Sequence, residues 1–545
     1  MTASKKRGAD ALIQSLQQAR VKRIFTLSGN HIMPVFDAAF DAGIELIHTR
    51  HEAATVHMAD AYARITGEPG IALVTGGPGH ANAVSALYTA QMAESAVVLL
   101  SGHAPNNQLG MGAFQEMRQA EIAAPVTKLS WTSASADALA SDMAKAISVA
   151  QSGRPGPVHL SLPTDALDGE TSAANAALDS TAFQPTAMPL SNADAASFLA
   201  KLSRAKRPLI LTGPASMTRV RRDQLAELEA ATSIPVIGME SPRGVGDPSL
   251  GAFAQMLALS DCVFLLGKRL DFTLKFGVVP AFAADCEFLQ IDAEKHELDR
   301  SRRAVGSRLI ATAEADTPSA IKALIAASTS TVKPRAAWLD DVRAAIAYRP
   351  DAWLNATSSI ADRLHPVQAL RPLQALLDSH PDSVFISDGG EIGQWAQACL
   401  NAPHRVINGV AGAIGAALPF ALGARVAVPD APIIAVMGDG TFGFHPAEMD
   451  TAVRYGLPFL AVVGNDARWN AEYQIQLRDY GRERLIGCEL LPTRYDQVTA
   501  AFGGHGEYVT SADALMPAAQ RAIASGKPSC MNVMIEGLPA PNVRR

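Results

Sequence analysis

A glycine turn that follows a buried apolar strand is the segment of this sequence best suited to chemistry. Residues 433–437 predict the strand, and Gly438, Gly440 and Gly443 then satisfy the G-x-G-x-x-G spacing of dinucleotide-binding turns. The residue between the first two glycines is Asp439, whose carboxylate would repel the oxygens of a bare pyrophosphate. A cation between the two groups would reverse the sign of that interaction. The turn therefore favours a metal-bound phosphate over a nicotinamide dinucleotide, which is the alternative that the spacing alone allows.

A second carboxylate follows the next predicted strand of the same region. Residues 459–463 predict that strand, and Asp466 lies just beyond its end. Neighbouring parallel strands end at the same edge of a sheet, where doubly wound domains bind their ligands. Taken one at a time, Asp439 as a helix cap and Asp466 as a turn residue are the simpler interpretations. Together they predict an oxygen-rich site of the kind that Mg²⁺ prefers.

These segments resemble the thiamine-diphosphate motif, which begins Gly-Asp-Gly and usually ends Asn-Asn. Here Asp466, 27 positions after Asp439, stands where the family usually has its second Asn, which adds a negative charge. The resemblance implies that Mg²⁺ is held by Asp439, Asp466 and the backbone carbonyl of Arg468. The residues it assigns to the diphosphate of thiamine diphosphate are Gly438, Gly440 and Thr441, with the loop Gly390, Glu391 and Ile392.

The family also uses a glutamate and an apolar wedge, and the sequence offers both. Glu52 starts a predicted helix over residues 52–66, where a first-turn acid that complements the helix dipole is the plainer interpretation. The resemblance implies instead that a buried Glu52, with a pKa raised by burial, hydrogen-bonds the aminopyrimidine ring and promotes loss of the thiazolium C2 proton. Ile414 would be the wedge between the two cofactor rings, and the Gly412 carbonyl would contact the amino group. The alternative for Ile414 is a core residue where a helix begins.

Other segments point to the group that contains acetolactate synthase, benzaldehyde lyase and 2-hydroxyacyl-CoA lyase. His31 is similar to a benzaldehyde lyase histidine over the cofactor and is expected to act as an acid or base, with a solvated loop histidine as the alternative. Phe114 and Gln115 resemble residues of acetolactate synthases and 2-hydroxyacyl-CoA lyases and would line the active site. The alternative is that they only begin a helix. Arg269 and Asp292 resemble residues of the CoA-using branch of the family, whose middle domain can hold ADP. The flavin-associated Asp-Asp-Arg pattern of acetolactate synthases is missing. Whether the middle domain binds FAD, ADP or neither is therefore left open.

Three regions share one pattern, in which short runs of Val, Ile and Leu are each followed by a turn and a helix. This pattern predicts the α/β class, with three doubly wound domains whose sheets are mostly parallel. We expect a pyrimidine-binding domain over residues 1–168, a middle domain over 194–327 and a diphosphate- and Mg²⁺-binding domain over 365–545. The predicted strands are 23–26, 45–48, 71–75, 96–101 and 158–162, then 208–212, 235–237, 262–266 and 288–291, then 383–387, 433–437, 459–463 and 529–535.

Composition excludes several other classes of protein. The chain has 545 residues, 47 Lys and Arg against 53 Asp and Glu, and a net charge of −6, which argues against a nucleic-acid partner. Its five cysteines lie far apart with no Cys-x-x-Cys pair, as is typical of a cytoplasmic protein. The uncharged stretch 406–423 contains Asn408, Pro419 and four glycines, so a loop entering a buried helix fits better than a membrane span.

Taken together, the sequence predicts a thiamine-diphosphate- and Mg²⁺-dependent carbon–carbon lyase or ligase. The expected reaction is decarboxylation of a 2-oxo acid and ligation of the product to an acceptor, as in acetolactate synthase. An enzyme like 2-hydroxyacyl-CoA lyase or oxalyl-CoA decarboxylase is the alternative, and a non-catalytic cofactor-binding relative is another. Because Glu52 and Asp439 belong to different domains, family geometry implies a site shared between subunits. We expect small-molecule substrates, a homodimer at minimum and a homotetramer.

Overall fold

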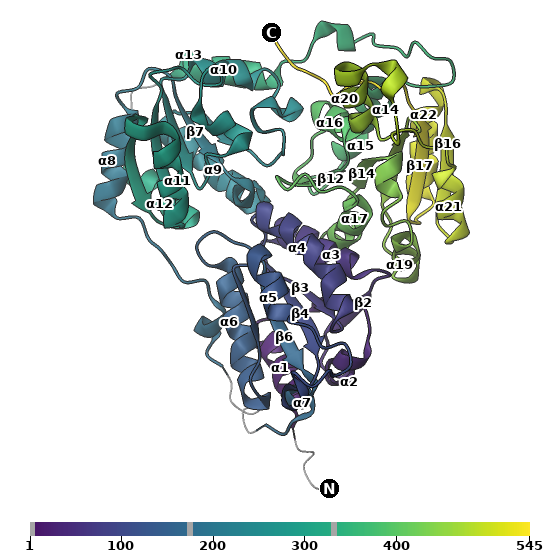
Figure 1. Cartoon of the computed structure of the whole chain (residues 1–545). Coiled ribbons are helices and arrows are strands. Elements are labelled where there is room, and N and C mark those ends of the chain that lie inside the picture. The colour runs from purple at the N-terminus through teal and green to yellow at the C-terminus, as the bar shows by residue number, and fades with distance from the viewer. Residues whose placement is uncertain (1–5, 172–177, 329–334) are drawn as a thin grey trace. The chain divides into compact units, whose positions relative to one another are not determined.

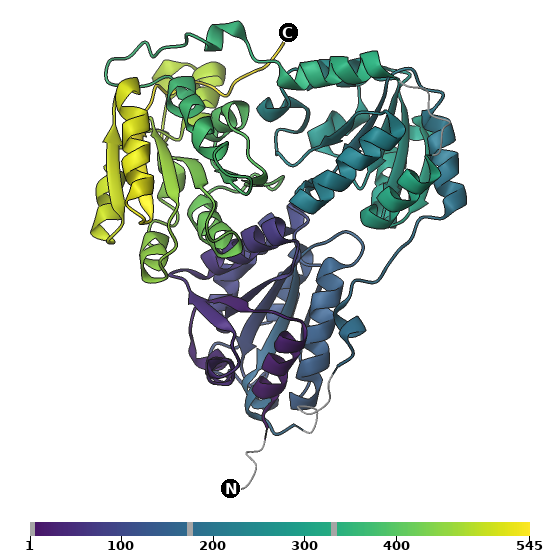
Figure 2. The same ribbon diagram turned by 180° about the vertical axis from the view of Figure 1, so that it is seen from behind.

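The structure is a computed structural model that describes residues 6–171, 178–328 and 335–545 (Figures 1 and 2). The chain forms two compact units, one of Met1–Thr186 with Leu422–Ala427 and one of Ala187–Ala421 with Val428–Arg545. Three parallel sheets, each with helices on both faces, confirm the predicted α/β class. Within the described ranges, no helix combines the length and the hydropathy that a membrane span requires.

The first unit is built on a six-stranded parallel sheet. In pairing order its strands are β2 (Glu45–His48), β1 (Arg23–Thr26), β3 (Gly70–Val74), β4 (Val97–His103), β6 (Val158–Pro163) and β5 (Leu129–Thr132). Its helices are α1 (Gly8–Gln18), α2 (Met33–Phe40), α3 (Glu52–Thr66), α4 (Pro78–Met92), α5 (Gln119–Ala123), α6 (Leu139–Gln151) and α7 (Thr164–Asp168). The strand order reverses between β1 and β3, and the edge beyond their carboxyl ends is where such sheets bind ligands.

Helix α3 shows how local sequence sets the position of a candidate residue. The His51 ring accepts a hydrogen bond from the Ala53 N–H at 3.1 Å, which caps the start of the helix and makes Glu52 its first residue. The helix ends at Gly67, whose φ of 76° is a left-handed conformation that glycine adopts without strain. The observed helix coincides with the predicted one.

The second unit contains two sheets, of which the first has five parallel strands. In pairing order they are β11 (Leu309–Glu314), β10 (Glu287–Asp292), β9 (Cys262–Leu266), β7 (Pro208–Thr212) and β8 (Val236–Gly238). The helices are α8 (Asn192–Leu202), α9 (Arg219–Thr232), α10 (Phe253–Leu259), α11 (Lys295–Val305), α12 (Thr317–Ala327) and α13 (Ala336–Ala347). Helix α13 lies where the sequence suggested only a connector, and its Trp338, Val342 and Ala345 pack into the core of this sheet.

The second sheet of this unit has six parallel strands. In pairing order they are β13 (His404–Ile407), β12 (Val384–Ser387), β14 (Ile433–Gly438), β15 (Leu460–Asn465), β17 (Ser529–Met534) and β16 (His505–Val509). The helices are α14 (Pro366–Leu370), α15 (Gln374–Leu377), α16 (Glu391–Cys399), α17 (Ala417–Ala427), α18 (Asp439–Phe442), α19 (Glu448–Arg454), α20 (Asn470–Tyr480), α21 (Tyr495–Ala501) and α22 (Ala512–Ala524). Its order reverses between β12 and β14, so the ends of these central strands form the binding edge.

Candidate active site

Two buried carboxylates lie at the ends of the neighbouring strands β14 and β15, as the sequence predicted. The register pairs Gly438 with Gly464, so Asp439 begins α18 at the same edge where Asp466 follows β15. Asp439 is 1% exposed and Asp466 7% exposed. Buried carboxylates are rare unless they are paired or bind a metal.

The electrostatics of this pair fit a bound cation. Burial raises the pKa of Asp439 to about 6, although the backbone N–H of Gly440 opposes the shift. Burial, and then the charge of Asp439, raise the pKa of Asp466 to about 8, with the Arg468 side chain opposing. The Asp439 Oδ2 atom is buried without a hydrogen-bond partner in the described part of the chain. A divalent cation would satisfy this oxygen and remove the repulsion, so the donor set fits Mg²⁺.

Two glycines beside Asp439 and Thr441 have no room for a side chain. A Cβ on Gly440 would lie 2.6 Å from the Trp469 ring, so that ring packs directly on the glycine backbone. A Cβ on Gly389 would lie 2.7 Å from Oγ1 of Thr441, which brings the turn after β12 next to the turn after β14. The structure thus joins two segments that the sequence assigned separately to the diphosphate.

The loop Gly390–Ile392 forms the start of α16, with Gly390 as the N-cap. Helix N-termini present free N–H groups to anions. Burial raises the pKa of Glu391, which Arg243 at 3.5 Å partly offsets. Ile392 is buried and packs on Gly464 of β15. This geometry suits a phosphate near the Gly390 end of the helix, with Glu391 turned toward Arg243.

Asp388, at the end of β12, is a functional candidate that the sequence analysis missed. One oxygen accepts the N–H of Gly389 at 2.6 Å, and the other accepts the N–H groups of Gly415 at 3.0 Å and Ala417 at 2.8 Å. Burial raises its pKa to about 6 against these hydrogen bonds. Asp388 therefore joins the diphosphate loop to the loop that carries Ile414. The rule used for Asp439, a carboxylate directly after a buried strand, would have found it.

Ile414 lies in a loop, because α17 begins only at Ala417. It is half-buried, and Gly412 beside it is exposed with a φ of 68°. Gly415 has a φ of 99°, and a Cβ there would lie 2.5 Å from the Phe444 ring. The alternative in which Ile414 simply begins a buried helix is therefore not what the structure shows, and the position suits a wedge.

In the first unit, Glu52 lies after β2 at the carboxyl edge of the sheet. Its side chain is half-buried rather than buried, because it faces that open edge. The Asn82 side chain on α4 donates a hydrogen bond to Oε2 of Glu52 at 3.0 Å. A Cβ on Gly79 would lie 3.4 Å from the other oxygen, Oε1. Asn82 and Gly79 are contacts of Glu52 that the sequence analysis did not identify.

His31 is 3% exposed, which removes the solvated-loop interpretation. Its Nδ1 lies 3.2 Å from Oγ1 of Thr75, the residue after β3. The Phe114 ring stacks on it, with ring centroids 6.0 Å apart and planes 12° apart. Burial lowers the pKa of His31. The imidazole is therefore mostly neutral at pH 7, so it can accept a proton and, once protonated, return it.

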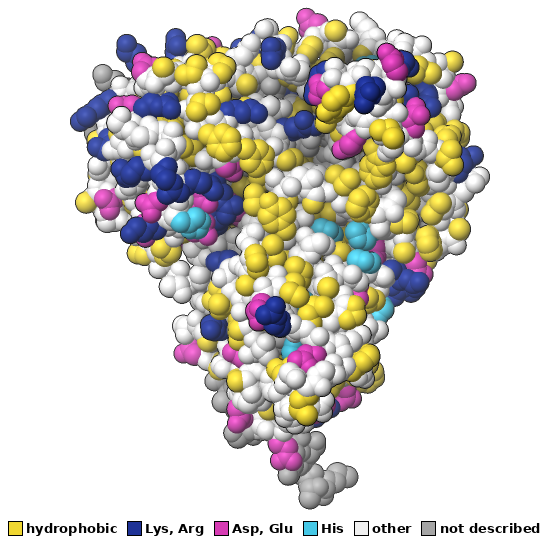
Figure 3. Space-filling view, in the orientation of Figure 1, with side chains coloured by type: hydrophobic (Ala, Val, Ile, Leu, Met, Phe, Trp, Pro, Cys, Tyr) yellow, Lys and Arg dark blue, Asp and Glu magenta, His cyan; other side chains and the backbone are white. Residues whose placement is uncertain are grey.

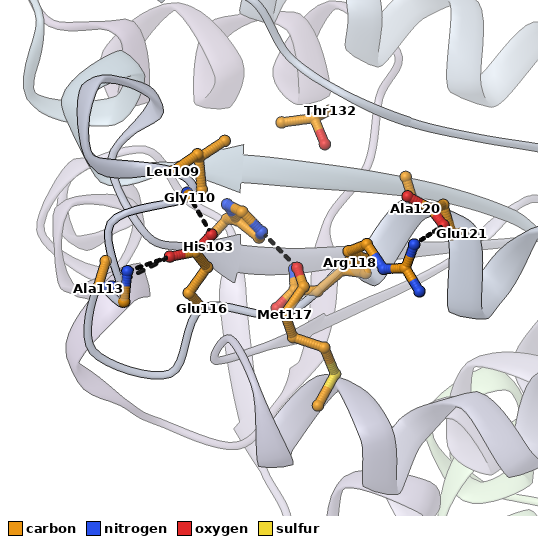
Figure 4. A pocket seen from close by; sticks show the side chains of 12 residues that line it. His103, Leu109, Gly110, Ala113, Glu116, Met117, Arg118, Ala120, Glu121 and Thr132 are labelled. Atoms are coloured by element: carbon orange, nitrogen blue, oxygen red, sulfur yellow. Dashed lines mark hydrogen bonds and ion pairs between the residues drawn. The ribbon is translucent and has the colours of Figure 1, made fainter.

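Phe114 and Gln115 belong to a loop and do not begin a helix, because α5 starts at Gln119. Phe114 is 69% exposed, and Gln115 has a left-handed φ of 55°. Glu116 holds the loop by accepting the N–H groups of Gly110 at 2.5 Å and Ala113 at 3.1 Å, as Figure 4 shows.

Residues of this loop, among them Leu109, Gly110, Ala113 and Glu116, line a cavity of about 670 Å³ (Figure 4). Several polar groups of its lining already have partners. The His103 ring nitrogens lie 3.0 and 2.9 Å from the carbonyls of Ala104 and Met117. Arg118, also in the lining, pairs with Glu121 at 3.0 Å. The cavity therefore adds space beside the loop but offers few free polar groups.

The five-stranded sheet brings Arg269 and Asp292 to its carboxyl edge. Arg269 follows β9, and Asp292 is the last residue of β10. Arg269 is paired with Glu297 at 3.2 Å and faces Glu294 at 3.7 Å. Asp292 is buried and accepts the N–H of Glu294 at 3.0 Å. Lys and Arg side chains gather over α11, next to this edge (Figure 3). A phosphate at Arg269 would have to compete with two carboxylates.

Comparison with known proteins agrees with this geometry. The family profile "Thiamine pyrophosphate enzyme, N-terminal TPP binding domain" matches residues 6–122. The central-domain profile of that family matches residues 195–315, and its C-terminal TPP binding domain matches residues 388–533. The chain belongs to the thiamine pyrophosphate enzyme family.

Its relatives have more than one activity. The chain is 32% identical to the acetolactate synthase large subunit IlvG of Mycobacterium tuberculosis over 539 residues, covering 96% of this chain and 95% of the relative. It is 29% identical to the 2-hydroxyacyl-CoA lyase 2 of Homo sapiens over 590 residues, covering 98% and 90%. The chain is thus an enzyme of the thiamine pyrophosphate family, similar along its length to synthases and to lyases.

Proposed function

We propose that this enzyme uses thiamine diphosphate and Mg²⁺ to decarboxylate a 2-oxo acid and to ligate the product to an acceptor carbonyl. The observation that carries the proposal is the buried Asp439–Asp466 pair with its unpartnered Asp439 oxygen, at the edge where the family's diphosphate is expected. When bound, thiamine diphosphate would supply a nucleophilic C2 carbon that adds to the donor carbonyl and a thiazolium ring that accepts the electron pair released on cleavage.

We assign a role to each predicted residue. Asp439, Asp466 and the Arg468 carbonyl hold Mg²⁺. The diphosphate is contacted by the residues that the sequence indicated, which are Gly438, Gly440, Thr441, Gly390, Glu391 and Ile392. Glu52 exchanges a proton with the cofactor's aminopyrimidine ring, and the Gly412 carbonyl with Ile414 orients the rings.

The substrate side of the site is assigned to the first unit. His31, buried and held by Thr75, acts as an acid or base near the reacting carbonyl. Phe114 and Gln115, on the exposed loop, line the acceptor position, and the Gln115 amide hydrogen-bonds a carbonyl or hydroxyl of the substrate. One or two such side chains are enough to set which acceptor is used.

We further propose a site assembled between subunits, with Glu52 from one copy and the metal site from another. A homodimer is then the smallest active form, and a homotetramer is the expected one. The five cysteines are free, which is compatible with a cytoplasmic location.

Cleavage of a 2-hydroxyacyl-CoA is the second candidate, because the human relative of that name aligns along 98% of this chain. The paired state of Arg269 disfavours a nucleotide phosphate at that residue. FAD or ADP in the middle domain therefore remains a prediction from resemblance alone. Retention of Glu52 disfavours a non-catalytic cofactor-binding protein.

The test is product analysis by mass spectrometry. Purified protein with thiamine diphosphate and Mg²⁺ is incubated with pyruvate in one arm and with a 2-hydroxyacyl-CoA in the other, each beside Glu52→Gln. Acetolactate or acetoin from pyruvate, lost in Glu52→Gln, supports the proposal. Carbon–carbon cleavage of the 2-hydroxyacyl-CoA, with no product from pyruvate, would replace it with the second candidate.

A further inference from the structure

The two oxygens of Glu52 have different surroundings. Oε2 accepts the hydrogen bond from Nδ2 of Asn82 at 3.0 Å. Oε1 lies toward Gly79, where an added Cβ would approach it to 3.4 Å. Gly79 and Asn82 are three residues apart on α4 and thus lie on one face of that helix. This face holds one oxygen of Glu52 through Asn82 and, at Gly79, places no side chain against the other.

The start of α4 is itself fixed by a buried glutamine. Oε1 of Gln119 accepts the N–H of Gly77 at 2.8 Å. Its Nε2 donates to the Gly102 carbonyl at 3.1 Å and to Oγ of Ser161 at 3.2 Å. Gln119 is 1% exposed, so these hydrogen bonds are shielded from water. The turn that begins α4 is therefore tied to two strands, and Asn82 extends from a fixed support.

We propose that Asn82 is a positioning residue that holds Oε2 of Glu52 and so presents Oε1 as the oxygen that exchanges a proton with the cofactor. The inference rests on the role proposed above for Glu52 and names the atom and the partner through which that role is carried out. A carboxylate held on one side loses its freedom to rotate, which aligns the other oxygen before the cofactor binds. With Oε2 engaged by the amide, Oε1 is the oxygen left to take up and release the proton.

The amide of Asn82 is suited to this task. It donates a hydrogen bond to Oε2 and places no charge beside Glu52. An aspartate in its place would put a second carboxylate within about 3 Å, which repels Glu52. An alanine would leave both oxygens free to rotate. Hydrogen bonds to ionised groups are strong enough that losing one is expected to slow the proton exchange about tenfold.

The proposal is tested by following deuterium exchange at C2 of bound thiamine diphosphate by quenched-flow NMR. This step requires Glu52 but no substrate. We expect Asn82→Ala to slow the exchange about tenfold and Asn82→Asp to slow it further. Asn82→Gln, which keeps an amide donor, should recover part of the rate. The dissociation constant of the cofactor and the melting temperature of the cofactor-free protein should change little, because Asn82 holds neither the diphosphate nor the core.

Two matched controls test whether the effect depends on the position of Asn82 beside Glu52. Asn192→Asp makes the same change of amide to carboxylate at the first residue of α8, in the middle domain. Ser85→Ala changes an exposed residue one turn along α4 from Asn82. Both controls should exchange at the wild-type rate.

The outcomes distinguish this inference from the proposed function. Wild-type exchange rates in Asn82→Ala and Asn82→Asp would overturn the role of Asn82. A loss of rate that only follows a fall in melting temperature would overturn it too, in favour of a structural role. Fast exchange in wild type without turnover of any 2-oxo acid would refute only the substrate class. Exchange as slow as that of the free cofactor would overturn the roles of both Glu52 and Asn82.

Discussion

Asp388 accepts the backbone N–H of Gly415 at 3.0 Å and so ties the end of β12 to the loop that carries Ile414. Its other oxygen holds the N–H of Gly389 at 2.6 Å. One buried carboxylate thus sets the relative position of the segments proposed to bind the diphosphate and to orient the cofactor rings.

We therefore expect Asp388→Asn to weaken cofactor binding about tenfold and to destabilise the protein by about 1–3 kcal/mol. The amide has one acceptor oxygen and a donor that would face backbone N–H groups. Isothermal titration with thiamine diphosphate and thermal unfolding measure the two effects. Asp430→Asn, an exposed position beyond α17, is the control. Unchanged affinity in Asp388→Asn would show that the two loops do not depend on this residue.

A methyl group on Gly440 is expected to damage the metal and diphosphate site. Its Cβ would lie 2.6 Å from the Trp469 ring, so the ring or the turn has to move, at a cost of about 1–3 kcal/mol. Gly440→Ala should bind Mg²⁺ and cofactor more weakly, as measured by fluorescence titration. Gly246→Ala is a matched control because nothing lies within 4 Å of the added carbon. Equal affinity in the two variants would contradict the steric argument.

The aspartate at position 466 should make Mg²⁺ binding depend on pH. In the metal-free protein the pKa of Asp466 is about 8, so at pH 7 a proton must leave before the cation can bind. Affinity should rise with pH up to about 8 and then level off. Asp466→Asn, which restores the usual family residue, should flatten this dependence between pH 6 and 8. Calorimetry in buffers of different ionisation enthalpy counts the protons released, and equal counts for both proteins would refute the explanation.

The buried His80 is expected to lower stability in acid. It lies on α4 with Nδ1 2.9 Å from Oγ of Ser101, and burial lowers its pKa from 6.5 to about 4. Below pH 6.5 the unfolded chain takes up this proton before the folded chain does, so stability falls as pH drops from 6.5 to 4, by up to about 3 kcal/mol. His80→Asn should reduce this slope in denaturant titrations. His296→Asn, at an exposed histidine, should leave it unchanged. Equal slopes in wild type and His80→Asn would contradict the assignment.

The core of the fold could be predicted from the sequence, but several edge strands could not. Central strands such as β3 and β4 are buried at every position, and they contain the continuous apolar runs 71–74 and 97–100. The strands missed by the sequence analysis are β5, β11, β13 and β16, and each lies at the edge of its sheet. In β5 every residue is only partly buried, and its four residues alternate between apolar and polar types, so it contains no continuous apolar run.

The candidate site was predictable to the extent that its residues follow strands. Asp439 and Asp466 were found because a carboxylate after a buried strand has a defined place at the sheet edge. Asp388 follows a buried strand too, and the same rule would have found it, although its hydrogen bond to Gly415 could not be predicted. Asn82 was missed because its role depends on Glu52, thirty residues away. Such pairings arise only once the sheets have assembled.

The central claim is tested most directly by measuring release of labelled carbon dioxide from [1-¹³C]pyruvate by the protein with thiamine diphosphate and Mg²⁺. The account predicts release by wild type that requires both additions and is lost in Glu52→Gln and in Asp439→Ala. Release that persists in Glu52→Gln, or its absence from folded wild-type protein that has bound both additions, would contradict it.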